Sequence, residues 1–150
     1  MRKLLTCLAL VAWAVPATAQ DALKIVPADG VTWRPHPLFP GAQTAVLAGD
    51  PSKPETIVQR NKFPPNFKVA PHMHSYVEVG TIISGSLGHG EGEKFDAGKG
   101  AMLKAGSVFA LPSGRPHYMW TANEEVVFQI NFTGPATITF HNPADDPRRK

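Results

Sequence analysis

The sequence His72-Met73-His74-Ser75-Tyr76-Val77-Glu78 carries the most informative pattern in this chain of 150 residues. His72 and His74 are two residues apart, so in a β-strand both imidazole rings project from the same face. Glu78 follows four residues later and stays on that face if the chain remains extended or turns tightly. The alternation places Gly80 beside it, facing the same interior. Two imidazoles and a carboxylate on one face suit a first-row transition metal.

A further histidine, His117, follows the segment Pro112-Ser113-Gly114-Arg115-Pro116, a rigid turn that would direct the chain into another strand. Four such ligands on an octahedral ion would leave two positions open for water, substrate or dioxygen. A single histidine is more often a surface residue or a hydrogen-bonded core residue, so the spacing alone leaves both interpretations open.

The chain around these residues has the pattern of an all-β protein. After residue 20 no window holds a 3.6-residue apolar period over three turns, and thirteen glycines and fifteen prolines disfavour a helical bundle. Short extended runs separated by Pro, Gly, Asn or Asp predict a single jelly-roll barrel. The predicted strands are 43–47, 56–63, 67–74, 76–83, 107–111, 117–121, 125–132 and 136–141, with 88–93 as a glycine-rich hairpin or loosely packed strand.

The two histidine segments resemble the two signature motifs of the cupin superfamily. In the first, His72-x-His74-x-x-x-Glu78 is followed after six residues by Gly85. The second runs from Gly106 through Pro112-x-Gly114 to His117. The chain looks like a small exported single-domain cupin of bacteria, which implies an RmlC-like double-stranded β-helix with an N-terminal extended arm.

Two positions depart from the cupin motifs. Asn66 replaces the glycine that usually opens the first motif, and Asn tolerates a left-handed backbone better than most residues. Thr121 replaces the asparagine that often closes the second motif, at a position away from the metal ligands.

The resemblance implies a metal centre, because all four positions that cupins use as ligands are occupied by ligand residues: His72, His74, Glu78 and His117. We expect one divalent transition metal, with Fe or Mn preferred and Zn, Ni or Cu as other candidates. Cupins with such sites include dioxygenases, oxalate-degrading enzymes, lyases and sugar isomerases. Dioxygenase chemistry is the leading hypothesis, with Glu78 as a catalytic base. A non-catalytic periplasmic cupin that binds a metal or small ligand is the alternative, and a purely structural metal is a third.

Strand periodicity suggests which residues line a substrate pocket. If His117 points inward, Met119 does too. In the run 125–132, either the odd positions or the even positions face the interior. The larger hydrophobic side chains at the even positions suggest an outer packing surface, which would leave Gln129 and Asn131 in the pocket. A solvent-facing polar side of an edge strand would explain these two amides equally well. We expect His36, His89 and His141 to be surface residues.

The first nineteen residues are typical of an export signal. Arg2 and Lys3 precede an apolar run of about a dozen residues, and Ala17-Thr18-Ala19 offers the small residues of a cleavage site. The run is too short to span a bilayer. We therefore expect a signal peptide at 1–19, an arm at 20–40, a cupin domain at 41–143 and a flexible tail at 144–150, in a periplasmic or secreted protein without a membrane anchor after cleavage.

The amino-acid composition limits the classes of binding partner that we expect. With 43% hydrophobic and 18% charged residues the chain is not intrinsically disordered. Its formal charge of +3 includes Arg2 and Lys3, and no basic stripe suggests nucleic-acid binding. The expected partners are a small-molecule substrate or ligand and a second copy of the chain, because cupins commonly pair through an edge strand such as the arm could provide.

Overall fold

The computed structural model describes residues 23–149, and it forms strands where the sequence alternates apolar and polar side chains between glycine and proline turns. Within these residues the helical segments are four single 3-10 turns, so the predicted all-β class is confirmed. The strands are β1 (Arg34–Pro35), β2 (Gln43–Ala48), β3 (Thr56–Phe63), β4 (Lys68–Met73), β5 (Glu78–Ser84), β6 (Ser86–Glu91), β7 (Ala101–Lys104), β8 (Val108–Leu111), β9 (His117–Thr121), β10 (Val126–Thr133) and β11 (Thr139–Phe140). The 3-10 turns are η1 (Ala28–Gly30), η2 (Ala97–Lys99), η3 (Pro143–Asp145) and η4 (Pro147–Arg149).

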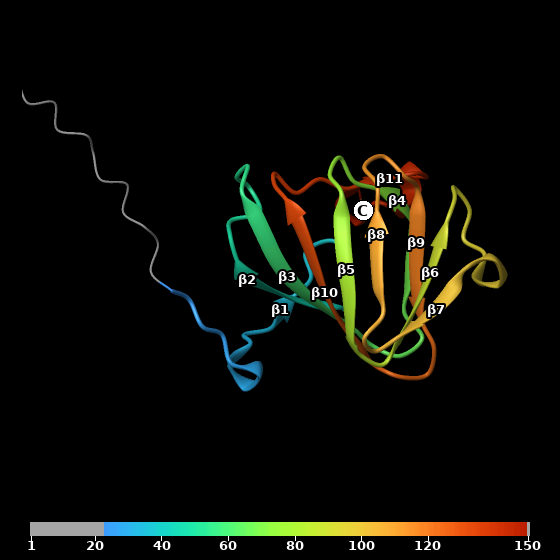
Figure 1. Cartoon of the computed structure of the whole chain (residues 1–150). Helices are drawn as coiled ribbons and strands as arrows, with labels where there is room; N and C mark the ends of the chain where they lie inside the picture. Colours follow the sequence, from blue (N-terminus) through green and yellow to red (C-terminus); the bar gives the residue numbers. More distant parts are fainter. Residues whose placement is uncertain (1–22, 150) are drawn as a thin grey trace, which may run out of the picture.

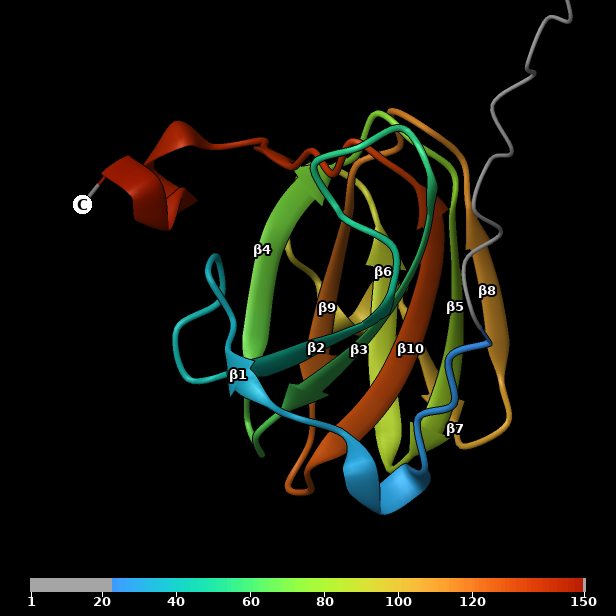
Figure 2. The ribbon, with the colours of Figure 1, turned by 90° about the vertical axis from the view of Figure 1, so that its left-hand side faces the viewer.

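The strands form two antiparallel sheets that face each other (Figures 1 and 2). The six-stranded sheet has the order β1-β2-β3-β10-β5-β8, and the five-stranded sheet has the order β11-β4-β9-β6-β7. Neighbouring strands within each sheet are mostly distant in sequence. This arrangement is the jelly-roll barrel expected from the motifs.

The core lies between the two sheets. Ile57 and Phe63 of β3, Phe128 of β10 and Ile82 of β5 are almost completely buried on the inner face of the six-stranded sheet. Val69 and Met119 approach them from the five-stranded sheet. The two inner faces therefore share one apolar layer, and the residues of the proposed metal site project into it.

The turn that leads into β4 depends on the two residues that depart from the cupin motifs. Asn66 has a φ of 57°, in the left-handed region that asparagine tolerates, as predicted. Thr121 is buried, and its hydroxyl donates to the carbonyl oxygen of Pro64 at 2.6 Å and accepts from the Phe67 amide at 2.8 Å. Thr121 thus fastens the β3–β4 turn to the end of β9, a role that the sequence did not indicate.

The glycine-rich segment is a regular strand, β6, between β7 and β9. Gly88 and Gly90 lie beneath the rings of Trp120 and Tyr118, so closely that a Cβ atom at either glycine would overlap the ring. Glycine is needed on this outer face of β6 because the aromatic rings of β9 fold over the strand. His89, which lies between the two glycines, consequently faces the interior.

The segment before β2 runs along the barrel, and η1 and β1 lie in it (Figure 2). After β11 the chain continues through η3 and η4, where buried Asp146 holds the Arg148 guanidinium at 2.8 Å. The expected signal peptide at 1–19 lies outside the described residues. None of the helical turns between residues 23 and 149 has the length and apolar character needed to span a membrane.

Candidate metal centre

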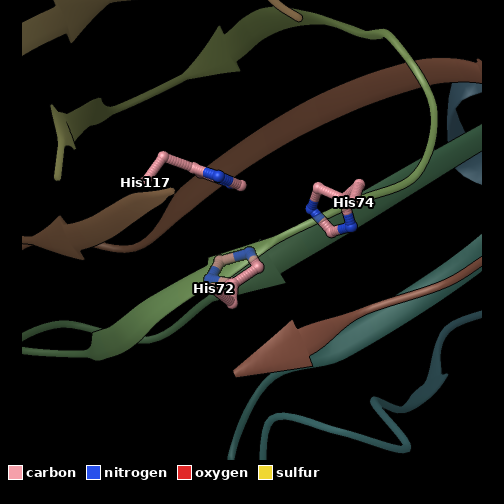
Figure 3. Close-up of side chains that lie close together, drawn as sticks. All are labelled: His72, His74 and His117. Atoms are coloured by element: carbon pink, nitrogen blue, oxygen red, sulfur yellow. The ribbon is translucent and has the colours of Figure 1, made fainter. Parts of the chain in front are cut away.

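Three histidines from neighbouring strands converge at one end of the barrel (Figure 3). His72 lies on β4, His74 directly follows that strand, and His117 begins β9, which pairs with β4 so that His72 and His117 are opposite each other. One nitrogen from each ring lies within 4.8 Å of the other two, and all three residues are buried. The spacing of two residues on β4 and the turn before β9 create this cluster.

Each ring is oriented by a backbone carbonyl. The Nδ1 atom of His72 lies 2.8 Å from the Ala70 carbonyl oxygen, and that of His74 lies 2.8 Å from the Thr137 carbonyl oxygen. The Nδ1 atom of His117 lies 3.3 Å from the carbonyl oxygen of Arg115. A carbonyl can only accept, so Nδ1 carries the proton and Nε2 keeps its lone pair. This is how metal-binding histidines are usually held.

The Nε2 atoms of His72 and His117 are buried without a hydrogen-bond partner among residues 23–149. A buried polar atom without a partner carries a desolvation cost, and a metal ion removes it by accepting the lone pair. The residues therefore fit a transition metal bound through three Nε2 atoms.

The electrostatic environment keeps the imidazoles neutral. Burial, together with the neighbouring histidines, lowers the pKa of His72 to about 3 and that of His117 to about 2. Burial also lowers the pKa of His74. Neutral imidazole is the form that coordinates a metal, so the cluster is ready to bind at neutral pH.

Glu78 opens β5 on the opposite sheet and is buried beside the histidines. Its Oε2 atom lies 3.6 Å from Nε2 of His74, but the carboxylate does not join the mutual 4.8 Å cluster of the three rings. Burial raises the pKa of Glu78 to about 7 and lowers that of His74, so burial disfavours charge on both groups. The structure thus brings all four expected ligands to one place, with Glu78 at its margin.

A cavity of about 570 Å³ borders the cluster. His72, His74 and Glu78 form part of its wall, and Met119 also lies in its lining. Most of the remaining lining is apolar. These apolar residues come from the arm, from β10, from the turn after β4 and from the segment before β11: Leu38, Phe39, Tyr76, Phe128, Ile130, Phe132 and Ile138.

A family model described as "Domain of unknown function (DUF4437)" matches residues 14–138 of the chain. The chain belongs to this family. No curated protein matches this DUF4437 protein.

Solved structures show that the DUF4437 chain has the cupin fold. The polyketide cyclase RemF from Streptomyces resistomycificus has a TM-score of 0.71 at 20% identity, over 84% of this chain and 90% of that chain. An RmlC-like cupin from Shewanella frigidimarina has a TM-score of 0.59 at 13% identity, over 75% of this chain and 91% of that chain. The DMSP lyase DddQ from Ruegeria pomeroyi has a TM-score of 0.60 at 16% identity, over 75% of this chain and 61% of that chain. This DUF4437 protein therefore has the cupin fold, as its motifs predict.

The assignment of Gln129 and Asn131 to the pocket was wrong. In β10 the even positions are buried, and Phe128, Ile130 and Phe132 line the cavity, while the two amides lie on the outer face. β10 is a central strand between β3 and β5, so its inner face meets the core and takes the larger apolar side chains. An amide pair does line the cavity of the DUF4437 protein, but it comes from β3: Gln59 and Asn61.

Two histidines expected on the surface are partly buried and face the interior. His36 of the arm lines the cavity, stacks on Phe39 with ring centroids 4.4 Å apart, and has its pKa lowered by burial to about 4. His89 faces inward from β6, between Phe109 and His117, and its Nε2 is buried with no partner among the described residues. The glycines on both sides of His89 were the available signal, because glycine on one face of a strand indicates close packing there.

Proposed function

We propose that this cupin is a mononuclear metal-dependent enzyme that acts on a small, largely apolar organic substrate by dioxygenase-like chemistry. The observation that carries the proposal is the position of His72, His74 and Glu78 in the wall of a 570 Å³ cavity. A metal that served only to hold the fold would be enclosed by protein. Here the ligands border a space of the size that organic ligands occupy in proteins.

The three histidines and Glu78 would hold the ion. A divalent iron or manganese ion at this site would supply Lewis acidity and a place for substrate oxygen atoms and dioxygen to bind. Neutral imidazoles with one carboxylate suit either metal, and zinc, nickel and copper are the other candidates. The carbonyl contacts at Nδ1 keep each ring fixed in the orientation that binding requires.

Glu78 is the proposed catalytic base. Its carboxyl group borders the cavity, and burial raises its pKa to about 7, close to the pKa that favours proton transfer at neutral pH. It would accept the proton of an enol or phenol as the substrate enters. Coordination to the metal would reduce this basicity, so the role requires a carboxylate that is weakly bound or released. Its place outside the mutual cluster of the three rings is consistent with that requirement.

The apolar walls would bind the body of the substrate and exclude water. Tyr76 stacks on Phe132 with ring centroids 4.3 Å apart, and His74 stacks on the other side of Tyr76 at 4.8 Å. A flat ring fits such walls better than a small dianion such as oxalate. The fold-level similarity to the polyketide cyclase RemF supports the choice of ring-bearing polyketones as test substrates.

The second candidate is a non-catalytic cupin that binds a small ligand at the metal. The observation that favours it is that Glu78 is the only carboxylate among the described residues of the cavity lining, so a Glu78 held by the metal would leave no other carboxylate to accept a proton, and the site would bind a ligand and leave it unchanged.

The deciding experiment begins with elemental analysis of protein purified without a histidine tag, with the oxidation state checked by electron spin resonance. We expect one equivalent of iron or manganese. Oxygen uptake is then measured with enols, 1,3-diketones and phenolic polyketones. Uptake coupled to loss of one of these compounds supports the enzyme.

The control is the double variant His72→Ala/His74→Ala, which should lose the metal and the oxygen uptake while keeping its β-sheet circular dichroism. A full equivalent of metal in this variant would refute the ligand assignment. Wild-type protein that takes up no metal, even after reconstitution, would end the proposal. Metal-loaded protein that binds these compounds without oxygen uptake would establish the non-catalytic candidate.

We further propose that residues 1–19 direct export to the periplasm and that the mature chain starts at Gln20. The supporting features are the basic start, the apolar run and the small residues before the cleavage point. Mass spectrometry of the periplasmic fraction should find the chain without these residues. An intact Met1 in a cytoplasmic fraction would contradict the assignment.

A further inference from the structure

A polar group lies within the apolar cavity, on the sheet that does not carry the histidines. Thr44 of β2 and Gln59 and Asn61 of β3 line the cavity together. Thr44 pairs across the strands with Asn61, and Phe128 of β10 pairs with Asn61 on its other side. The three polar side chains therefore occupy a defined place on the inner face of the six-stranded sheet.

The hydrogen bonds fix how the Asn61 carboxamide points. Its Oδ1 atom accepts from the Thr44 hydroxyl at 2.9 Å and from Nε2 of Gln59 at 2.9 Å. Two donors on Oδ1 use both of its lone pairs and set the orientation of the amide. The NH₂ group is then directed away from both neighbours.

The Nδ2 atom of Asn61 has no acceptor among residues 23–149, although the residue is only 3% exposed. Unlike the Nε2 atoms of His72 and His117, this donor is not completely enclosed, so it can reach a ligand in the cavity that Asn61 lines. A ligand with an acceptor oxygen at that place would receive its hydrogen bond. An apolar side chain of similar size would serve at this position if packing alone were needed, whereas here two neighbours hold an amide in one orientation.

We propose that Asn61 is a specificity-determining residue that donates a hydrogen bond from Nδ2 to a carbonyl or hydroxyl oxygen of the cavity ligand, while Thr44 and Gln59 hold it in position. This inference rests on the proposed function for the identity of the site, and it narrows the substrate class. The ligand is a ring-bearing ketone or phenol with one oxygen group directed to the histidines and a second acceptor oxygen directed to β3.

The surroundings of Asn61 support an uncharged acceptor. Arg60 and Lys62 alternate with Gln59 and Asn61 along β3 and so project from the opposite face of the sheet, and Arg60 bonds Gln129 there at 3.2 Å. No cationic side chain of β2 or β3 lines the cavity, and the Arg148 guanidinium, which does line it, is paired with Asp146. A carboxylate beside Asn61 would therefore meet no unpaired cation from these strands, whereas a ketone oxygen needs only the amide donor.

The test compares two probes of nearly equal shape, acetophenone and isopropylbenzene, which differ in the acceptor oxygen. Binding to the zinc-loaded and the metal-free full chain is measured by nuclear magnetic resonance, with the Asn61 side-chain amide as the reporter. In the wild type we expect the ketone to bind more tightly, and its binding to shift the Asn61 amide proton downfield. In Asn61→Leu the preference for the ketone should fall roughly tenfold, the value of one hydrogen bond.

Two further variants sharpen the result. Asn61→Asp keeps an acceptor for Thr44 and Gln59 but replaces the NH₂ donor with oxygen, so it should lose the ketone preference even if Asn61→Leu folds poorly. Asn131→Leu changes the same residue type on the outer face of β10, where its amide lies 3.5 Å from the Val79 oxygen, and should leave the preference unchanged.

An equal ketone preference in wild type and both Asn61 variants, an unshifted Asn61 amide, or no binding of acetophenone would overturn the inference. This binding test is independent of the oxygen-uptake test of the proposed function, because binding is measured without turnover. A protein that binds the ketone through Asn61 but takes up no oxygen keeps this subsite and loses the enzyme. Oxygen uptake that is insensitive to Asn61 substitution, in a protein with no ketone preference, would support the enzyme and refute the Asn61 subsite.

Discussion

The carbonyl oxygen of Thr137 lies 2.8 Å from Nδ1 of His74, although 63 residues separate the two in sequence. The hydroxyls of Ser75 and Thr137 are 2.6 Å apart, and the Ser75 amide donates to the same Thr137 hydroxyl at 3.0 Å. These contacts link the segment before β11 to the turn after β4. One of the three proposed histidine ligands takes its orientation from a part of the chain that the cupin motifs do not include.

Removing the Ser75–Thr137 hydrogen bonds should weaken metal binding without changing any metal-coordinating residue. In the double variant Ser75→Ala/Thr137→Ala the carbonyl of Thr137 loses its restraint, and we expect metal affinity to fall roughly tenfold or more, as is common when a partner of a ligand is disturbed. Competition with a chelator measures the change. Thr133→Ala, which removes an exposed threonine at the end of β10 and outside the cavity lining, is the matched control and should bind as the wild type does. Equal affinity in all three proteins would show that the attachment does not orient His74.

The metal-free protein should lose stability on acidification. His72 and His117 have folded pKa values of about 3 and about 2 against a reference of 6.5, so below pH 6.5 the unfolded chain binds protons that the folded chain does not. The free energy of unfolding should therefore fall from pH 6.5 towards pH 4. Glu78, with its pKa raised from 4.5 to about 7, acts in the opposite direction between those values, but it is one group against five, because burial also lowers the pKa of His36, His74 and His89.

Urea unfolding in the presence of a chelator, followed by tryptophan fluorescence at several pH values, checks this dependence. The variant His72→Gln/His117→Gln provides the control, since removal of the two buried imidazoles should flatten the slope. A free energy of unfolding that stays constant or rises between pH 6.5 and pH 4 would contradict the neutral, buried state of the cluster.

Substitutions at Gly80 and Phe109 should have strongly non-additive effects on the free energy of unfolding. The Phe109 ring lies so close over Gly80 that an added Cβ atom would overlap it, and the two residues face each other in the β5–β8 pairing. Gly80→Ala should cost about 1–3 kcal/mol of unfolding free energy because the ring must move. Combining it with Phe109→Leu should cost less than the sum of the single changes. Simple additivity in chemical unfolding would mean that the ring already has room.

Homodimer formation remains a prediction, and the arm provides a way to test it. Leu23 and Ile25 are 87% and 75% exposed, and on the outer face of the barrel Val79 and Val108 are also exposed. We expect sedimentation equilibrium at micromolar concentration to give the mass of two chains, and Leu23→Asp/Ile25→Asp to give that of one. A single-chain mass for the wild type would refute the pairing.

The local features of the site could be predicted from the sequence because they depend on spacing. The two-residue interval between His72 and His74 fixes a common face, and Asn66 takes the left-handed conformation that its residue type tolerates. These inferences need no knowledge of which strand lies beside which.

The lining of the cavity could not be predicted in the same way, because it depends on non-local neighbours. Gln129 and Asn131 were placed inside on the assumption that bulky side chains at the even positions cover an outer surface, whereas β10 lies between β3 and β5 and turns those side chains to the core. A usable signal was present in β3. Arg60 and Lys62 required an exposed face, which left Gln59 and Asn61 with the interior.

The two sheets divide the labour of the site. The five-stranded sheet and its turns bring the three histidines, whereas the six-stranded sheet brings Glu78 on β5 and, from β2, β3 and β10, the side chains that would touch the rest of a ligand. Substitutions on the inner faces of β2, β3 and β10 therefore leave all four proposed metal ligands in place. A lineage that inherits this barrel can change what it recognises while its metal chemistry persists, and a protein engineer could start from the same separation by randomising positions 44, 59, 61 and 128 alone.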